Sequence, residues 1–122
     1  MFPEGQPTLS VGITDSLGER IQRALPGTSV VKALNTMNCD VMVDPGLVPG
    51  DHVVFVCGDD AGAKARTVAL LGELGWPPER VVDAGDITGA RATEAYILIW
   101  LRMMGWAGGA RFNIAVQRAR GQ

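Results

Sequence analysis

The sequence predicts an α/β protein, in which about three mostly parallel strands form a sheet between flanking helices. Short β-branched runs at 30–34, 52–57 and 80–84 alternate with stretches whose apolar residues recur at helical spacing, a pattern typical of a largely parallel sheet. Hydrophobic residues make up 47% of the 122 residues and charged residues 20%, so the chain can bury a core. No repeat or linker interrupts it, and we expect a single domain over residues 1–122.

The first element in chain order is a short amphipathic helix. Ser16-Leu-Gly-Glu19 matches a capping box, and apolar residues then recur at helical spacing until Pro26. A strand over Val30 to Leu34 follows. The next stretch, 35–46, is rich in turn-forming residues and predicts a loop with room for one helical turn. A loop of this length is a plausible carrier of function.

The second half of the chain repeats the strand and helix order. After the strand at 52–57, Asp59 or Asp60 is placed to cap a helix that runs to Leu74. After the strand at 80–84, Asp86 or Thr88 can cap the last helix. We therefore interpret these aspartates as helix caps rather than as catalytic carboxylates.

The densest apolar segment is Ala95–Leu101, which continues through Met103 to a helix end near Gly105. It is too short for a bilayer, which needs about 20 residues of helix, and we interpret it as a core helix whose aromatic and Met side chains pack inward or at a dimer contact. The tail over 106–122 has no assigned structure.

Charge and composition exclude several kinds of partner. The formal net charge of −2 removes the electrostatic case for nucleic acid or an anionic membrane. Cys39 and Cys57 follow no zinc spacing, and a lone His52, expected to be exposed, cannot complete a metal site. Both cysteines are expected to be inert and buried. With no secretory signal pattern at the N-terminus, the expected setting is the reducing cytoplasm.

The candidate site lies where the first strand ends. In open α/β sheets, ligands bind beyond the carboxyl ends of strands, which places Lys32, Asn35 and Thr36 where a ligand is expected. Two simpler interpretations stay open. Asn35 and Thr36 can serve only to turn the chain, and Lys32 can be a solvated or ion-paired lysine.

Three strands are few for a parallel sheet. Parallel strands are normally buried on both faces of the sheet. A sheet of only three strands would leave unpaired backbone N–H and C=O groups at its two edges. We therefore expect another segment or chain to pair with this sheet.

Several segments together resemble the NADP-dependent oxidoreductases that use a deazaflavin coenzyme. The resemblance covers residues 8 to 118 and is most specific in Val30-Val-Lys-Ala-Leu-Asn-Thr36 and Val54-Phe-Val-Cys-Gly-Asp-Asp60. It extends to Thr8-Leu-Ser-Val-Gly-Ile-Thr-Asp-Ser-Leu-Gly-Glu19, Val43-Asp-Pro45, Leu74-Gly-Trp76 and Val82-Asp-Ala-Gly-Asp86. It implies a partial Rossmann-like three-layer domain.

Members of that family carry an N-terminal half with a Gly-rich turn that binds the pyrophosphate of NADP. No Gly-x-Gly-x-x-Gly occurs here, so the resemblance implies the C-terminal, acceptor-side portion. It places Lys32, Ala33, Leu34, Asn35 and Thr36 beside NADP and the deazaflavin coenzyme. No catalytic acid or base is expected, because hydride transfer between bound rings depends mainly on orientation and exclusion of water.

The function expected from the resemblance is hydride transfer between NADPH and a deazaflavin coenzyme, with the isolated chain inactive. The expected partner is a second copy in a homodimer or a separate nucleotide-binding half. Two alternatives stay open. One is a non-catalytic dimerising module, and the other is a small ligand-binding regulatory domain with similarity confined to its strands.

Overall fold

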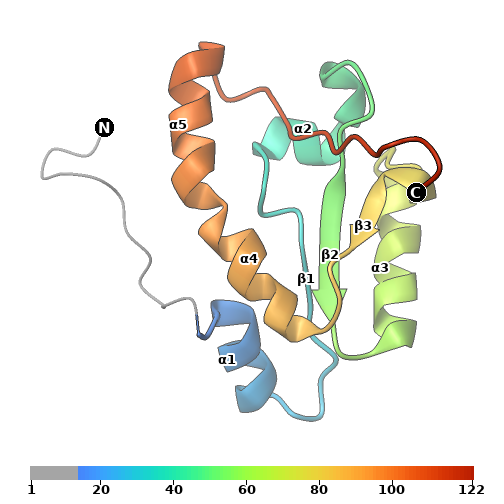
Figure 1. Ribbon diagram of the computed structural model, residues 1–122. Helices are drawn as coiled ribbons and strands as arrows, with labels where there is room; N and C mark the ends of the chain where they lie inside the picture. Colours follow the sequence, from blue (N-terminus) through green and yellow to red (C-terminus); the bar gives the residue numbers. More distant parts are fainter. Residues whose placement is uncertain (1–13) are drawn as a thin grey trace, which may run out of the picture.

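The computed structural model describes residues 14–122 and shows a small α/β fold (Figure 1). Part of the family resemblance, residues 8–13, lies outside the described residues. Helices and strands alternate along the chain as the sequence predicts. In order they are α1 (Leu17–Ala24), β1 (Val31–Ala33), α2 (Cys39–Val43), η1 (Pro45–Leu47), β2 (Val54–Gly58), α3 (Ala61–Glu73), η2 (Pro78–Arg80), β3 (Val81–Asp83), η3 (Ile87–Gly89), α4 (Ala90–Ala95) and α5 (Ile97–Ala107).

The three strands form one sheet in the order β1-β2-β3. β2 and β3 are parallel, joined through α3, with Val54 opposite Val81. β1 is antiparallel to β2, with Val31 opposite Gly58. The α/β class with three strands and flanking helices is confirmed, and the sheet is mixed rather than uniformly parallel. The reason is the connection 34–53, in which α2 and η1 carry the chain past the end of β1 so that β2 returns beside it.

The described helices lie on two sides of this sheet. Figure 1 shows α3 on one side and α1, α4 and α5 on the other. The largest buried side chain of the core is Trp76, whose indole Nε1 donates to the Met42 carbonyl at 3.0 Å. The remaining buried members of this core cluster are Met37, Val41, Val54, Val56 and Leu71.

The predicted caps of α1 and α3 are confirmed, whereas Asp86 caps η3 and neither α4 nor α5 has a side-chain cap. Ser16 Oγ accepts a hydrogen bond from the Glu19 main-chain N–H at 3.1 Å and begins α1. Asp60, rather than Asp59, caps α3 by accepting from the Ala63 N–H at 2.7 Å. Local caps of this kind satisfy N–H groups that the first helical turn leaves unpaired.

His52 is buried, so the expectation of an exposed histidine is wrong. Its side chain is 2% exposed, and its Nε2 lies 2.8 Å from the Pro45 carbonyl oxygen and 3.0 Å from that of Val48. Its Nδ1 lies 2.9 Å from the amide nitrogen of Asn113. The two carbonyl oxygens at Nε2 can accept a hydrogen bond from the ring, and the Asn113 amide can donate one to Nδ1. The sequence pattern missed these partners because Asn113 is distant along the chain.

The C-terminal tail runs beside His52 and Val53. The Val53 N–H donates to the Ile114 carbonyl at 3.0 Å, and an isolated antiparallel bridge joins His52 to Ala115. Part of the tail, which the sequence left unassigned, therefore continues the hydrogen bonding next to β2.

Two further expectations are wrong in part. Cys57 is buried as expected, but Cys39 is exposed because it stands in the first turn of the short α2. The apolar segment from Ala95 is helical, but α5 contains no buried residue within the described structure and is not a core helix. It contacts α4, and its Trp100 stacks on Phe112 of the tail. None of the described helices combines the length and hydropathy needed to cross a membrane.

Candidate functional site

The predicted site segment, residues 32–36, leaves β1 through a tight change of direction. Leu34 has a φ of 66°, in the left-handed region, and it is the only described residue other than glycine with a positive φ. A leucine in this region costs of order 1 kcal/mol or more, and such conformations cluster at functional sites. The bend sends Thr36 inward, where it is buried and its Oγ1 has no hydrogen-bond partner among the described residues.

The two polar side chains at either end of this bend, Lys32 and Asn35, contact α4. The Asn35 amide Nδ2 donates to the Thr93 main-chain carbonyl at 2.8 Å. Lys32 Nζ lies 3.4 Å from Glu94 Oε2, with side chains 23% and 19% exposed. The ion-paired interpretation of Lys32 is therefore confirmed. These two contacts hold α4 beside β1.

Glu94 also connects this site to α1. Its carboxylate accepts hydrogen bonds from the main-chain N–H groups of Leu17 at 2.7 Å and Gly18 at 2.9 Å. A carboxylate at a helix N-terminus is favoured by the helix dipole and by the unpaired N–H groups there. The close approach of α4 to α1 favours glycine at position 18, because a Cβ there would lie a tight 3.0 Å from the Cβ of Ala90.

A second ion pair joins α4 to α1. Arg91 Nε and Nη2 donate to Glu19 Oε2 and Oε1 at 2.9 and 2.8 Å, and Ser16 Oγ donates to Glu19 Oε2 at 2.7 Å. The Arg91 guanidinium, followed by the Ser16 hydroxyl, holds the pKa of Glu19 below its ordinary value. Two parallel N–H···O bonds of this kind give geometric specificity as well as energy. α1, β1 and α4 thus form one linked unit around the candidate site.

The antiparallel direction of β1 separates two groups of polar residues that a parallel arrangement would bring together. Asn35 and Thr36 follow the carboxyl end of β1, whereas Asp59 and Asp60 follow the carboxyl end of β2. Because Val31 pairs with Gly58, these carboxyl ends point to opposite ends of the sheet. The structure does not bring Asp59 and Asp60 to the predicted site.

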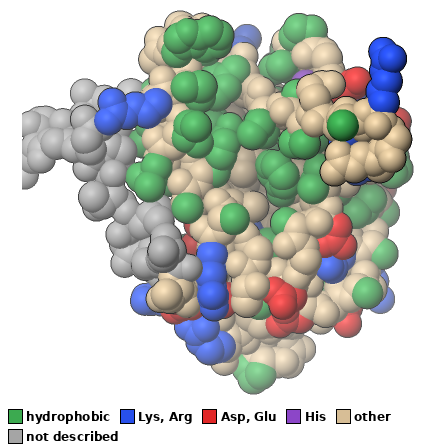
Figure 2. All heavy atoms as spheres, viewed as in Figure 1, with side chains coloured by type: hydrophobic (Ala, Val, Ile, Leu, Met, Phe, Trp, Pro, Cys, Tyr) green, Lys and Arg blue, Asp and Glu red, His purple; other side chains and the backbone are tan. Residues whose placement is uncertain are grey.

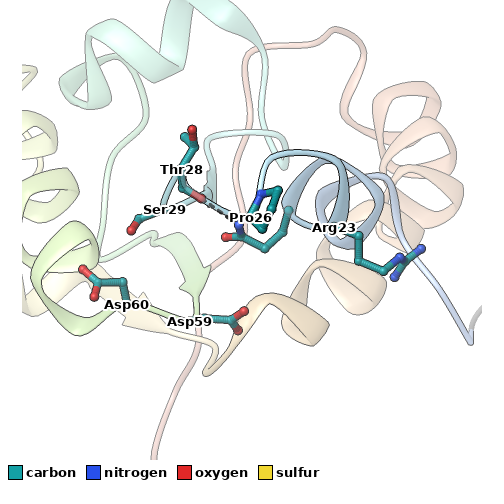
Figure 3. Close-up of a pocket in the computed structure, with 7 residues that line it drawn as sticks. Arg23, Pro26, Thr28, Ser29, Asp59 and Asp60 are labelled. Atoms are coloured by element: carbon teal, nitrogen blue, oxygen red, sulfur yellow. Dashed lines mark hydrogen bonds between the residues drawn. The ribbon is translucent and has the colours of Figure 1, made fainter.

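Asp59 and Asp60 instead border a cavity of about 400 Å³ at the end of β2 (Figure 3). Gln22, Arg23, Pro26, Thr28 and Ser29 complete its lining. Asp60 caps α3, and Asp59 Oδ1 accepts from the Ile87 N–H at 3.0 Å. Asp60 therefore stabilises the start of the helix that follows it, as the sequence predicts, whereas Asp59 stabilises the start of the distant η3, which the sequence did not predict.

The predicted residues can be tested for fit to the coenzymes that the resemblance implies. Asn35 Oδ1 has no hydrogen-bond partner among the described residues and can accept from a carboxamide or ring N–H. Lys32 contacts Glu94 among the described residues, and its ammonium group has three protons to donate. These residues fit contacts to a coenzyme ring and a nearby anion. They do not fit a pyrophosphate cradle, which needs a Gly-rich turn before a helix.

Sequence reasoning missed Glu94, Thr93 and Arg91, the partners of the predicted site. Their contacts span 58 to 77 residues of chain. The only local signal was the presence of charged residues in an otherwise apolar helical segment, which does not identify their partners.

Among the described residues, no group of three or more His, Cys, Asp or Glu side chains is placed to hold a metal ion.

A solved structure of high similarity exists for this fold. No protein-family model matches the chain. The crystal structure of a "putative F420-dependent NADP-reductase" from Arthrobacter sp. FB24 is 51% identical, matches 96% of this chain and superposes with a TM-score of 0.88.

The match covers 53% of the Arthrobacter protein, so this chain spans about half the length of that structure. That share agrees with the C-terminal portion predicted from the sequence. This similarity confirms the resemblance predicted from the sequence, because nearly the whole chain is similar to about half of a protein described as an F420-dependent NADP-reductase.

Proposed function

We propose that this chain is the acceptor-side portion of an NADP-dependent reductase, which transfers hydride between NADPH and the deazaflavin coenzyme F420. The observation that carries the proposal is the 51% identity over 96% of the chain. Hydride transfer is the chemistry that the two coenzymes supply when bound. The chain contributes positioning through the segment Lys32, Ala33, Leu34, Asn35 and Thr36.

Within this segment, each residue has a role that its surroundings support. Asn35 is half-buried and offers its Oδ1 to a donor on a coenzyme, while its Nδ2 is held by Thr93. Lys32 attracts an anionic group and is oriented by Glu94. The side chains of Ala33 and Leu34 have no polar atoms, and the Thr36 hydroxyl is buried. These three residues therefore contribute through their main chain.

The test is calorimetric titration of the 122-residue chain with oxidised F420 and, separately, with NADPH. We expect F420 to bind and NADPH to bind weakly or not at all, because the sequence has no Gly-x-Gly-x-x-Gly turn. Steady oxidation of NADPH by the chain alone would contradict the proposed inactivity of the isolated chain. Failure of F420 to bind a folded chain would contradict the proposed acceptor site.

A non-catalytic dimerising module is the second candidate, and the exposed apolar surface of α5 favours it. Light scattering across a range of concentrations tests it. A stable homodimer that binds neither coenzyme would support the module over the reductase. We also propose the cytoplasm as the location of this chain, which the similarity to a reductase supports.

A further inference from the structure

His52 is a buried titratable group that the proposed coenzyme site does not use, and it is the one histidine of the chain. Its ring makes an edge-on contact with the Trp76 indole, with ring centroids 5.3 Å apart. Nε2 lies within hydrogen-bond distance of the carbonyl oxygens of Pro45 and Val48 and can donate to them. Nδ1, the other ring nitrogen, faces the side-chain amide of Asn113 in the C-terminal tail at 2.9 Å.

The orientation of the Asn113 amide decides what Nδ1 can do. Asn113 Nδ2 also lies 2.9 Å from the Val53 carbonyl oxygen and donates to it. Turning the amide over would put Oδ1 against that carbonyl oxygen, and two acceptors cannot pair. The amide keeps this orientation although its Oδ1 is buried without a partner among the described residues. Nδ1 of His52 is therefore held as an acceptor, and a proton there would face the N–H groups of Asn113.

No carboxylate in the described part of the chain compensates for a positive charge on His52. The segments around the ring are α2, η1, the turn before β2, the end of α3 with η2, and the tail. Their charged side chains, none of which hydrogen-bonds or ion-pairs with the imidazole, are Asp40, Asp44, Asp51, Glu73, Glu79, Arg80, Arg111, Arg118 and Arg120. Four of them pair with one another, Arg80 with Asp51 at 3.2 Å and Arg111 with Asp40 at 3.1 Å. A buried charge without a partner is costly, so protonation of His52 requires a local change of the fold.

The attachment of the tail depends on the same contacts. Beyond Arg111, every hydrogen bond that joins the described tail to the rest of the described chain is made to His52 or Val53. Two come from the Asn113 amide, and the third runs from the Val53 N–H to the Ile114 carbonyl at 3.0 Å.

The attached tail also closes one side of a cavity. Phe112, Asn113 and Ile114 line a cavity of about 310 Å³ against α5. Figure 2 shows hydrophobic side chains gathered on the side of the molecule where α5 lies. Loss of the Asn113 contacts would free the tail and open this cavity to water.

We propose that His52 and Asn113 form a proton-sensitive latch, in which protonation of His52 at Nδ1 releases the C-terminal tail from residues 52–53. The latched state holds His52 without the second proton. The released state exposes the ring to water, which solvates the charge. Because the released state binds one more proton, its population increases as the pH falls. The latch does not depend on the proposed coenzyme chemistry.

NMR spectroscopy of the ¹⁵N-labelled 122-residue chain tests the latch between about pH 8 and pH 5, the range in which histidines ordinarily titrate. Long-range ¹H–¹⁵N spectra report the protonation of the imidazole, and the chain has only one. Hydrogen exchange of the Val53 N–H, corrected for the intrinsic effect of pH, reports its bond to Ile114. We expect this exchange to accelerate about tenfold or more as His52 becomes protonated. The Ala84 N–H, which donates to the Val56 carbonyl at 2.7 Å, is the control and should keep its rate.

Three results of this titration would overturn the proposal. One is protonation of His52 without faster exchange at Val53, as a turned-over Asn113 amide that still held the tail would give. Another is equal acceleration at Val53 and Ala84, which would mean that the whole fold opens. The third is a ring that stays neutral down to about pH 5.

Asn113→Asp should reverse the direction of the pH dependence. Its carboxylate repels the Val53 carbonyl oxygen while His52 is neutral, and it accepts from Nδ1 once His52 is protonated. The Val53 N–H should then exchange more slowly at about pH 5 than at about pH 8. The matched control is Asn38→Asp, which adds the same charge at the N-cap of α2, where aspartate caps as well as asparagine. This control should behave like the unaltered chain.

His52→Gln removes the titrating group, so the corrected exchange of the Val53 N–H should no longer depend on pH. A pH dependence that is unchanged in His52→Gln would assign the effect to another group. A pH dependence of the same direction in Asn113→Asp as in the unaltered chain would show that Asn113 does not sense the proton. Either result contradicts the latch.

Discussion

The side chain of Asn35 donates a hydrogen bond to the main-chain carbonyl of Thr93, 2.8 Å away and 58 residues further along the chain. This contact gives Asn35 a structural role in addition to the proposed coenzyme contact. It ties the turn after β1 to α4 and holds the Asn35 amide in one orientation. Positioning of this kind is what hydride transfer between two bound rings requires of a protein.

Replacing Asn35 by Ala should lower both stability and coenzyme affinity. We expect the free energy of unfolding to fall by about 1 kcal/mol, the usual net value of one hydrogen bond, and F420 to bind more weakly in calorimetry. The control is Asn38→Ala, which removes the N-cap of α2 and costs a similar amount, about 1 kcal/mol. Equal affinity in the two variants would show that Asn35 is purely structural.

Glu94 should matter for folding more than its partial exposure suggests. Glu94→Ala removes the acceptor of the Leu17 and Gly18 N–H groups and the partner of Lys32. We expect a loss of about 1–3 kcal/mol in urea unfolding, as for other buried or charged hydrogen bonds left unmade. Glu94→Gln keeps one side-chain oxygen and should lose less. Equal losses in the two variants would contradict a role for the oxygen that Gln retains and would assign the whole effect to the charge and the other oxygen.

The free energy of unfolding should fall at low pH, in part because the Glu19 carboxylate becomes protonated. Its pKa lies below the ordinary value of 4.5 because of Arg91 and then Ser16. Because the pKa of Glu19 is lower in the folded chain than in the unfolded chain, its contribution to the free energy of unfolding is fully present at pH values above its ordinary pKa. It is lost as the pH falls through the folded-state pKa, where the native carboxylate becomes protonated.

Urea unfolding between about pH 2 and pH 6 measures this dependence. Glu19→Gln should flatten the curve, and Arg91→Gln should flatten it to a similar extent because it removes the main cause of the shift. A curve for Glu19→Gln that is parallel to that of the unaltered chain would show that other carboxylates account for the acid sensitivity.

The two cysteines should differ in reactivity with a thiol reagent. Cys39 is exposed and Cys57 is buried, and burial raises the pKa of the Cys57 thiol, with nearby charges as smaller causes. Only the thiolate reacts, so we expect the folded chain to release one equivalent with Ellman's reagent and the urea-unfolded chain to release two. Cys39→Ser should abolish the folded-state reaction. Fast reaction that survives this substitution would mean that β2 opens readily.

Gly89 tests how closely η3 packs on the sheet, and Gly72 in α3 serves as its control. A Cβ at Gly89 would lie 2.5 Å from the Ala84 carbonyl oxygen and 3.0 Å from Cys57 Cβ. Gly89→Ala should therefore destabilise by about 1–3 kcal/mol, as overpacking does. Gly72 lies in α3 with open space around it, so Gly72→Ala should stabilise by about 0.5–1 kcal/mol. Thermal unfolding of both variants checks the pair.

The sequence by itself determined the α/β class, the order of the elements and the caps of α1 and α3. These features depend on residues within about four positions of one another. Ser16 and Asp60 cap helices through contacts that span three residues, and each strand was recognisable as a β-branched run. The resemblance to a deazaflavin-dependent NADP-reductase was also recognisable from the segments around Lys32 and Asn35.

Only the tertiary structure decided how these elements meet. Whether β1 runs parallel or antiparallel to β2 depends on the path of residues 34–53. No local sequence pattern specifies that path. His52 is buried because Asn113, 61 residues away, supplies its third partner. Lys32 and Glu94 come together for the same reason. Contacts between distant residues are selected by packing across the whole fold, so they cannot be read from the spacing of residues along the chain.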